Sequence, residues 1–176
     1  LISYFFIFLL LSNRMRDLQK DLKIGNREEI KTLILLNASD TMFGELEQDE
    51  DPFANFDFVS EDKKYHIEHK WRPDINLKTC RYDSLYFDRV KYKRFIELKK
   101  EDPEKRCFII WNCSGDRVWW EFKKYGWENE DGEVEMYFSK QYNQDRGKGY
   151  PQDTDMCNVF MEALHPFSDF FKIEII

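Results

Sequence analysis

Phe56-Asp57-Phe58-Val59-Ser60 and Tyr65-His66-Ile67-Glu68-His69-Lys70-Trp71-Arg72 are the two short runs that decide the fold of this chain. Both are rich in aromatic and β-branched residues, which is typical of β-strands. The four residues between them, Glu61 to Lys64, are all charged and favour a solvent-exposed turn. The pattern therefore predicts a hairpin of two antiparallel strands.

The second run separates two kinds of side chain, because successive residues of a strand point to opposite faces of its sheet. Its bulkier side chains share one face, and Glu68 and Lys70 share the other with His66 and Arg72. We expect the neighbouring strand to bring Asp57 beside them. Carboxylates hold Mg²⁺ together with water and phosphate oxygens, and an ammonium group stabilises charge that develops on a phosphate. This group of side chains suits phosphodiester hydrolysis.

The pattern of an Asp, ten intervening residues and Glu-x-Lys resembles the PD-(D/E)XK nuclease superfamily. That superfamily has the restriction-endonuclease-like fold and includes Holliday-junction resolvases and many phage and repair nucleases. Phe56 stands where the family name has Pro. The resemblance implies an α/β fold with a mixed central sheet flanked by helices. It also implies Asp57 and Glu68 as catalytic ligands of Mg²⁺ or Mn²⁺, with Lys70 as their catalytic partner.

Residues 15–37 have a helical pattern that is interrupted at Gly25. Asn26 followed by Glu29 forms a capping box, which predicts a new helix from Asn26 and accounts for Glu29 structurally. A Gly followed shortly by Glu in the first helix also resembles the superfamily's N-terminal element, whose acidic residue often joins the metal site. The resemblance thus implies Glu29 as a catalytic residue and metal ligand, with Glu28 as the competing position.

A second amphipathic helix is predicted from about Asp88 to Lys100. Lys91 falls in the middle of its apolar stripe, which consists of Phe87, Val90, Phe95 and Leu98. A lysine there either reaches along the apolar surface to solvent or meets a buried partner. In the superfamily the helix after the Glu-x-Lys strand often supplies a further basic residue, so the resemblance implies a catalytic role for Lys91.

Positive charge is concentrated around the same elements. Residues 63–100 hold twelve Lys or Arg against five Asp or Glu, a net charge of +7, whereas the whole chain carries −7 and the remainder therefore −14. A basic face on an acidic body is typical of proteins that bind nucleic acid. We expect Arg72, Arg89, Lys93 and Arg94 to contact nucleic acid, DNA rather than RNA, unless they only keep this face solvated.

The expected core of the fold covers about residues 25–122, in the order helix, hairpin, helix, strand. One partner strand, joined to the last by a turn at Ser114-Gly115-Asp116, completes it. The expected strands outside the first hairpin cover Met42 to Leu46, Cys107 to Trp111, Arg117 to Phe122 and Glu133 to Phe138, and a short helix is expected from Asp155 to Leu164.

We expect residues 15–176 to be a single nuclease-like domain and residues 1–14 to be an apolar N-terminal extension. The apolar run from Ile2 to Leu11 is too short for a membrane span, which needs ~20 residues. It is either an extension upstream of a start at Met15 or a membrane-associated tail or extra helix. The four cysteines form no C-x-x-C pair, which favours reduced thiols in a cytoplasmic protein.

Three functions stay open from the sequence. The first is a metal-dependent deoxyribonuclease, and because such nucleases often dimerise, a homodimer is one expected assembly. The second is a protein of the same fold that binds nucleic acid or joins an assembly without catalysis. The third is an unrelated α+β interaction domain in which the motif is accidental. Asp57 within ~5 Å of Glu68, close enough for one cation to bridge them, would separate the first two from the third. Activity with Mg²⁺ would separate the first from the second.

Overall fold

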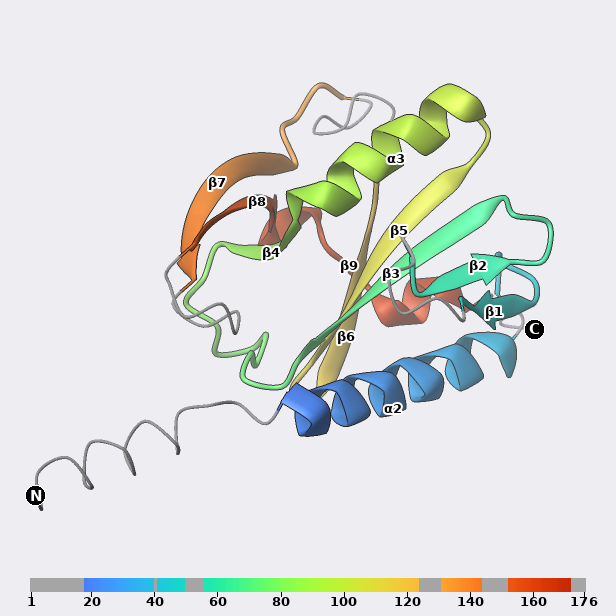
Figure 1. The fold of residues 1–176 in the computed structure, drawn as a ribbon, viewed down its shortest axis with the longest axis horizontal. Helices are drawn as coiled ribbons and strands as arrows, with labels where there is room; N and C mark the ends of the chain where they lie inside the picture. The colour runs from blue at the N-terminus through green and yellow to red at the C-terminus, as the bar shows by residue number, and fades with distance from the viewer. Residues whose placement is uncertain (1–17, 40, 50–55, 124–130, 144–151, 172–176) are drawn as a thin grey trace, which may run out of the picture.

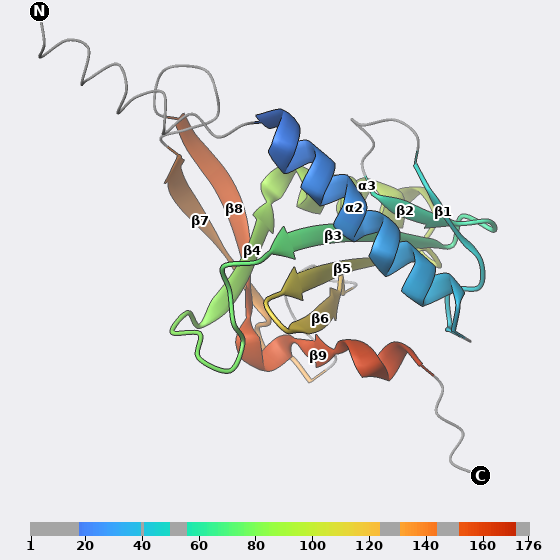
Figure 2. The ribbon, with the colours of Figure 1, turned by 90° about the horizontal axis from the view of Figure 1, so that it is seen from below.

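The computed structural model describes residues 18–39, 41–49, 56–123, 131–143 and 152–171. Their strands form two sheets, one mixed and one antiparallel (Figure 1). The two α-helices of these described residues, α2 (Leu18–Asn37) and α3 (Arg89–Glu101), lie on opposite faces of the larger sheet (Figure 2). The architecture is α+β, and the expected mixed sheet flanked by helices is present.

The larger sheet has the strand order β1-β2-β3-β5-β6-β9. β2 and β3 form the expected antiparallel hairpin, with Val59 opposite His66, and β3 runs parallel to β5. Parallel neighbours need a crossover connection, and α3 lies within it. The strands of this sheet are β1 (Leu46–Gln48), β2 (Phe58–Ser60), β3 (Tyr65–Arg72), β5 (Arg106–Cys113), β6 (Asp116–Glu121) and β9 (His165–Pro166).

One face of the larger sheet packs against α2. Phe58, Ile67 and Phe108 are fully buried there beside Leu36 of the helix. Phe167 and Phe170 close the same cluster from the 3-10 turn η2 (Phe167–Phe170). The alternation predicted for β3 therefore holds on this face, where Ile67 lies in the core.

α2 runs without a break from Leu18 to Asn37, so the predicted new helix at Asn26 and its capping box are wrong. The backbone of Gly25 does not have the positive φ that favours glycine. A side chain would also fit at this position, since a Cβ would meet no atom within 4 Å. The glycine thus neither ends the helix nor serves a close approach. Docking of the helix on the sheet stabilises the continuous form, as tertiary packing commonly does for helices.

The opposite face of the sheet packs against α3, which was predicted within one residue of its observed start and end. The helix buries Tyr92, Phe95 and Leu98, and the rings of Phe56 and Phe95 stack with centroids 5.1 Å apart. Val90 was expected in this stripe but is 68% exposed. The buried stripe passes through Tyr92 instead, because the aromatic ring reaches Phe122 and the core.

The smaller sheet has the order β4-β8-β7 and covers the same face beside α3. It consists of β4 (Ser84–Asp88), β8 (Gln152–Phe160) and β7 (Met136–Asn143). The helix predicted from Asp155 to Leu164 is wrong, since most of it is the central strand of this sheet, followed by the 3-10 turn η1 (Met161–Ala163). A short apolar run suits a buried strand and a buried helix equally, and pairing with two distant strands decides between them here.

Two smaller differences concern element ends. The first strand begins at Leu46, the last residue of the segment in which it was expected, and the strand expected over Glu133 to Phe138 is β7, which runs from Met136 to Asn143. The hairpin of β5 and β6 turns at Gly115, whose φ of 83° suits glycine. In the part of the chain described above, no helix is both long and apolar enough to cross a bilayer.

Candidate active site

Residues from four elements meet at the edge of the face that α3 covers. Glu68 and Lys70 extend from β3, Lys91 from α3, and Asp57 from the residue just before β2. Glu29 of α2 completes the group through its electrostatic interaction with Glu68 and both lysines. All five residues that sequence reasoning singled out for catalysis are therefore in one neighbourhood.

Asp57 is held in place by the backbone of β3. Phe58 pairs with Ile67, so Asp57, one residue earlier, comes to lie next to Glu68. Its own N–H donates to the carbonyl of Ile67 at 3.0 Å. Its Oδ2 accepts a hydrogen bond of 2.6 Å from the N–H of His69. The carboxyl thus lies against β3 between the two residues of the Glu-x-Lys motif.

Glu68 is the centre of the charged cluster, with only 3% of its side chain exposed. Its Oε1 lies 2.7 Å from the Lys70 Nζ, and its Oε2 lies 2.9 Å from the Lys91 Nζ. The geometry at Oε2 is not that of a hydrogen bond, so that contact is an ion pair. Asp88, at the start of α3, adds a weaker contact of 3.7 Å to Lys70. Two partly exposed lysines on one buried carboxylate thus join β3 and α3.

Glu29 and Glu28, which competed for the same role, have different surroundings. Glu29 accepts a hydrogen bond of 3.4 Å from the Nε2 of Gln48 in β1, and Glu28 pairs with Lys31 on the helix surface. Burial and the charge of Glu68 raise the pKa of Glu29, while Lys70 and the Gln48 hydrogen bond oppose the rise. Glu29 is thus the residue of α2 whose charge acts on the cluster.

The pKa of Asp57 shows that its surroundings disfavour a negative charge on this carboxyl. Burial, then the charge of Glu68, raises the pKa of Asp57 to about 7, against the opposing effect of the His69 hydrogen bond. Burial alone would lower the pKa of Lys70, but Glu68, Asp88 and Asp57 together raise it. The lysines therefore neutralise Glu68 well and Asp57 poorly. A cation near Asp57 would relieve this imbalance.

Two buried residues that sequence reasoning missed support the cluster from the other face of β3. The Nε2 of His69 lies 3.2 Å from the Oγ1 of Thr32 in α2, and both residues are buried. Burial, with the charges of Arg117 and Lys70, lowers the pKa of His69 to about 3, so the ring is neutral. Since the N–H of His69 also holds Asp57, this contact links α2 to the site. The one sequence signal for this contact was the position of His69 on the apolar face of β3.

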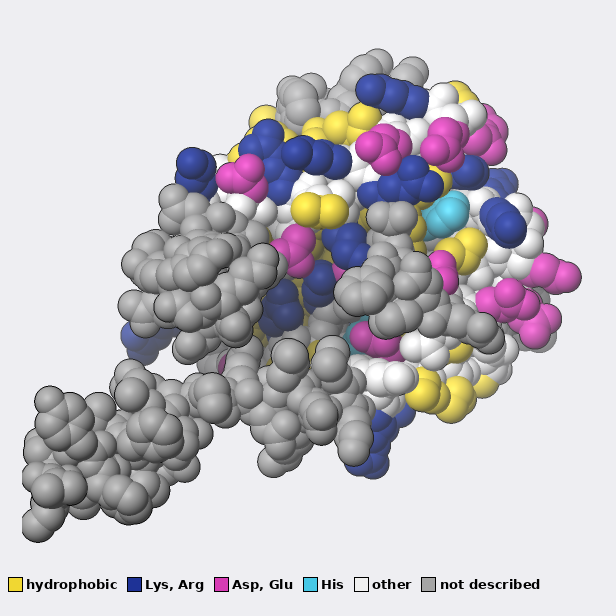
Figure 3. All heavy atoms as spheres, viewed as in Figure 1, with side chains coloured by type: hydrophobic (Ala, Val, Ile, Leu, Met, Phe, Trp, Pro, Cys, Tyr) yellow, Lys and Arg dark blue, Asp and Glu magenta, His cyan; other side chains and the backbone are white. Residues whose placement is uncertain are grey.

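The four residues expected to contact nucleic acid lie around the cluster rather than in it. Lys93 is exposed, while Arg72 lies over the ring of Tyr86 at 4.8 Å. Arg89 contacts Asp155 at 3.4 Å, and the Nη1 of Arg94 lies within 3.3 Å of two glutamates of α3. Figure 3 shows Lys and Arg side chains in a hollow near the middle of this face and along α3, with acidic side chains among them. The basic face is thus real but partly neutralised.

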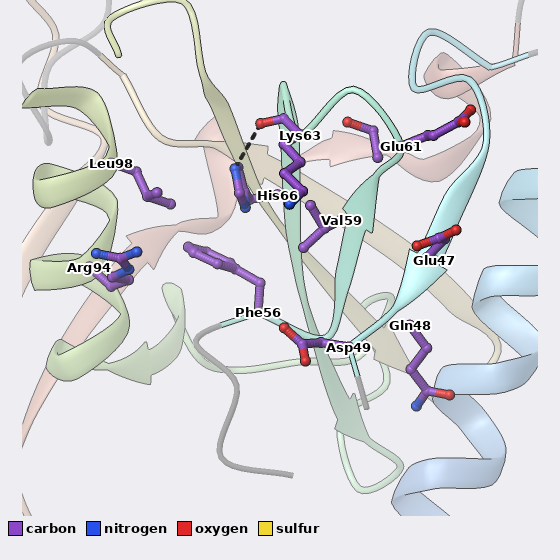
Figure 4. A pocket seen from close by; sticks show the side chains of 11 residues that line it. Glu47, Gln48, Asp49, Phe56, Val59, Glu61, Lys63, His66, Arg94 and Leu98 are labelled. Carbon is purple, nitrogen blue, oxygen red and sulfur yellow. Dashed lines mark hydrogen bonds between the residues drawn. The ribbon is translucent and has the colours of Figure 1, made fainter. Parts of the chain in front are cut away.

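A separate hollow of about 730 Å³ lies between β1, β2 and α3 (Figure 4). The figure shows Phe56 extending into it toward Arg94 and Leu98 of α3, with His66 bound to the carbonyl of Lys63. Burial lowers the pKa of His66. None of the five predicted catalytic residues lines this hollow, so we assign the chemistry to the charged cluster instead.

The oxygen donors of Asp57, Glu68 and Glu29 are the type that Mg²⁺ prefers. Within the described residues, no group of three or more His, Cys, Asp or Glu side chains stands ready to hold a metal ion. Mg²⁺ needs only one or two carboxylates beside water and substrate oxygens. The raised pKa of Asp57 and the off-axis contact at Glu68 Oε2 are consistent with such a cation. The donor set therefore fits Mg²⁺ when one of the two lysines gives up its contact with a carboxylate oxygen of Glu68.

No protein-family model matches the chain, and no curated protein and no solved structure matches it either.

Proposed function

We propose that this protein is a metal-dependent nuclease that hydrolyses phosphodiester bonds of DNA, with a core of the restriction-endonuclease-like type. The single observation that carries the proposal is the convergence of Glu29, Asp57, Glu68, Lys70 and Lys91, from four separate elements, into one cluster. An accidental Glu-x-Lys on a solvated strand would not bury Glu68 between two lysines.

The order of elements supports the same proposal. A helix is followed by three antiparallel strands, then by a crossover helix and a strand parallel to the third. This is the arrangement that the resemblance to the PD-(D/E)XK superfamily implies for its core. The smaller sheet, which contributes β4 before α3, is an addition to it.

The chain's own residues have distinct roles in this proposal. Asp57 and Glu68 would hold Mg²⁺ or Mn²⁺, with Glu29 as a further oxygen donor. When bound, the metal ion supplies a Lewis acid for the phosphoryl oxygen and lowers the pKa of a bound water. Lys70 neutralises Glu68 in the free protein and offers its charge to the phosphate when substrate is present. Lys91 positions Glu68 from the opposite side.

The experiment that tests the proposal is cleavage of duplex, single-stranded and four-way-junction DNA with Mg²⁺ and with EDTA. Cutting should require the metal and should fall by ~10²–10³ in rate in Lys70→Ala, the range for loss of one preorganised charge or donor in other enzymes. Lys78→Ala is the matched control, because Lys78 is an exposed lysine in the loop between β3 and β4.

Undiminished cutting by Lys70→Ala would show that this cluster is not the active site. Metal-independent binding without any cutting would instead favour a non-catalytic nucleic-acid-binding protein of the same fold. In that case Asp57→Ala and Glu68→Ala should bind DNA as the unchanged protein does, since phosphate contacts come from the basic residues around the cluster.

A further inference from the structure

A cleft of about 950 Å³ adjoins the candidate active site on the side away from α3. It lies between the first half of α2, the end of β3 and the smaller sheet, whose places Figures 1 and 2 show. Glu29 belongs both to its lining and to the charged cluster, and Arg72 lines it two residues beyond Lys70. The cleft therefore shares Glu29 with the candidate site and lies beside it.

Four aromatic side chains line the cleft. Tyr82 is 70% exposed and Tyr137 is 37% exposed. Trp71 and Tyr86 are half-buried, and the guanidinium of Arg72 covers the Tyr86 ring at 4.8 Å. Exposed rings of this size are costly to leave in water, whereas every nucleic-acid base offers a flat surface on which an aromatic ring can stack.

The charge of the cleft excludes phosphate as its occupant. Among the described residues that line it, Glu29, Asp74 and Asp83 are acidic and Arg72 is the basic one. A duplex presents its charged backbone outward, so its phosphates would be repelled by these carboxylates. An unpaired strand can instead turn its uncharged bases into the cleft and leave its phosphates near Lys70 and Lys91.

The far wall of the cleft is polar and ordered. The Nδ2 of Asn158 donates to the Oγ of Ser139 at 2.8 Å, and the hydroxyl oxygens of Ser84 and Tyr137 lie 3.1 Å apart. These groups offer hydrogen-bond donors and acceptors to base edges, while the Ser84 contact keeps the Tyr137 ring in a fixed position. A fixed ring loses little entropy when a base stacks on it.

We propose that this cleft binds the unpaired bases of a DNA strand whose backbone passes the charged cluster. The inference rests on the proposed function and gives it a substrate class: DNA with a single-stranded tail, flap or gap beside the bond that is cut. Tyr82 and Tyr137 are the residues that stack on the bases.

The test compares two DNA duplexes that differ only in the tail, one carrying bases and the other abasic. Binding is measured in EDTA, and a 2-aminopurine in the tail reports stacking by loss of its fluorescence. We expect the protein to bind the base-bearing tail about tenfold or more tightly, since one base stacked on an aromatic ring contributes that much in other proteins. Tyr82→Ala with Tyr137→Ala should abolish the preference, and Tyr82→Phe, which retains the ring, should keep it.

Phe138→Ala is the matched control, because Phe138 is exposed on the opposite face of the same strand and packs under Arg89. It should keep the preference for the base-bearing tail. If the double variant does not fold, Tyr82→Ala alone decides, since a side chain with this exposure contributes little to the core. Equal affinity for the two tails, or an unchanged preference in the Ala variants, would overturn the inference.

The result also separates this inference from the proposed nuclease activity. Metal-dependent cutting with equal affinity for both tails would leave the nuclease in place and remove the role of the cleft. A preference for the base-bearing tail without any cutting would keep the cleft as a single-strand binding site and remove the nuclease.

Discussion

On one face of β3, His69 is buried against α2 beside Thr32; on the other face, Glu68 is buried and Lys70 lies mostly covered beside it. Burial lowers the pKa of His69 to about 3, so this face carries a neutral ring. On the opposite face burial also disfavours the charge of Lys70, yet the neighbouring carboxylates raise its pKa. A buried polar group is neutral where it has a neutral partner and charged where it has an opposite charge.

The two faces of β3 therefore differ in the charge that they carry. The α2 face of the sheet packs against the helix. It also positions Asp57, which accepts a hydrogen bond from the backbone N–H of His69. The α3 face holds Glu68 in ion pairs with Lys70 and Lys91. The four predictions below test the two faces separately, in order of decreasing expected effect.

Removing Glu68 should have the largest effect on stability. Glu68→Ala leaves Lys70 and Lys91 without their shared counter-charge in a mostly buried position. Loss of one partner of a buried ion pair costs about 3 kcal/mol or more. Urea unfolding at neutral pH measures it, with Glu104→Ala, an exposed acid after α3, as the control. A loss no larger than that of the control would show that the lysines do not depend on Glu68.

Asp57→Asn should stabilise the protein, and more so at pH 8 than at pH 5. The native pKa of about 7 lies above the ordinary value of 3.8, so ionising Asp57 destabilises the native state as pH rises through this interval. We expect a gain of about 2 kcal/mol at pH 8, below what the whole shift implies because the carboxyl is partly exposed. Mg²⁺ should raise the melting temperature of the unchanged protein at pH 8 but not that of the variant. A pH-independent gain would contradict the raised pKa.

Thr32→Val should lower the free energy of unfolding by about 1 kcal/mol, because the Nε2 of His69 loses its buried partner.

The pH dependence of stability that His69 causes has the opposite sign to that of Asp57. Since its native pKa of about 3 lies below the ordinary 6.5, stability is lost as pH falls through this range. Thermal melts from pH 7 to pH 4 should therefore lose this acid-side slope in His69→Gln. A slope equal to that of the unchanged protein would show that His69 is not buried in its neutral form.

Lys93→Ala should have the smallest effect. Lys93 is exposed on α3, two residues from Lys91, and so should leave stability unchanged within ~0.5 kcal/mol. If Lys93 contacts a phosphate, DNA binding weakens uniformly across sequences, and the slope of log affinity against log salt concentration falls by about one.

Lys91→Ala should instead slow cutting, because it removes a cation 2.9 Å from Glu68. Equal effects of the two changes on cutting would mean that Lys91 acts only as general positive charge.

The arrangement of the candidate site was largely predictable because its central part obeys a local rule. Strand alternation places Glu68 and Lys70 on one face of β3, and a short hairpin returns Asp57 to the same place. The helical period likewise directed Lys91 toward the sheet. Glu29 was expected from the resemblance alone, and its capping box, the local explanation, proved wrong.

The residues that sequence reasoning missed act through partners far away in the chain. Thr32 is polar and unremarkable until α2 lies against His69, which is 37 residues later. Asp88 becomes a partner of Lys70 only because β4 leads into α3 at this point. The cleft likewise joins Trp71 to Tyr137, which belong to different sheets.

The sequence by itself determined the hairpin, the two faces of its second strand, the helix from Arg89 and the hairpin of β5 and β6, since each depends on neighbours a few residues apart. Only the tertiary structure decided that α2 continues through Gly25 and that residues 152–160 form a strand. It also decided that one glutamate is shared by two lysines. These outcomes depend on the free energy of packing and pairing between distant segments, which exceeds the small local preferences that a sequence pattern records.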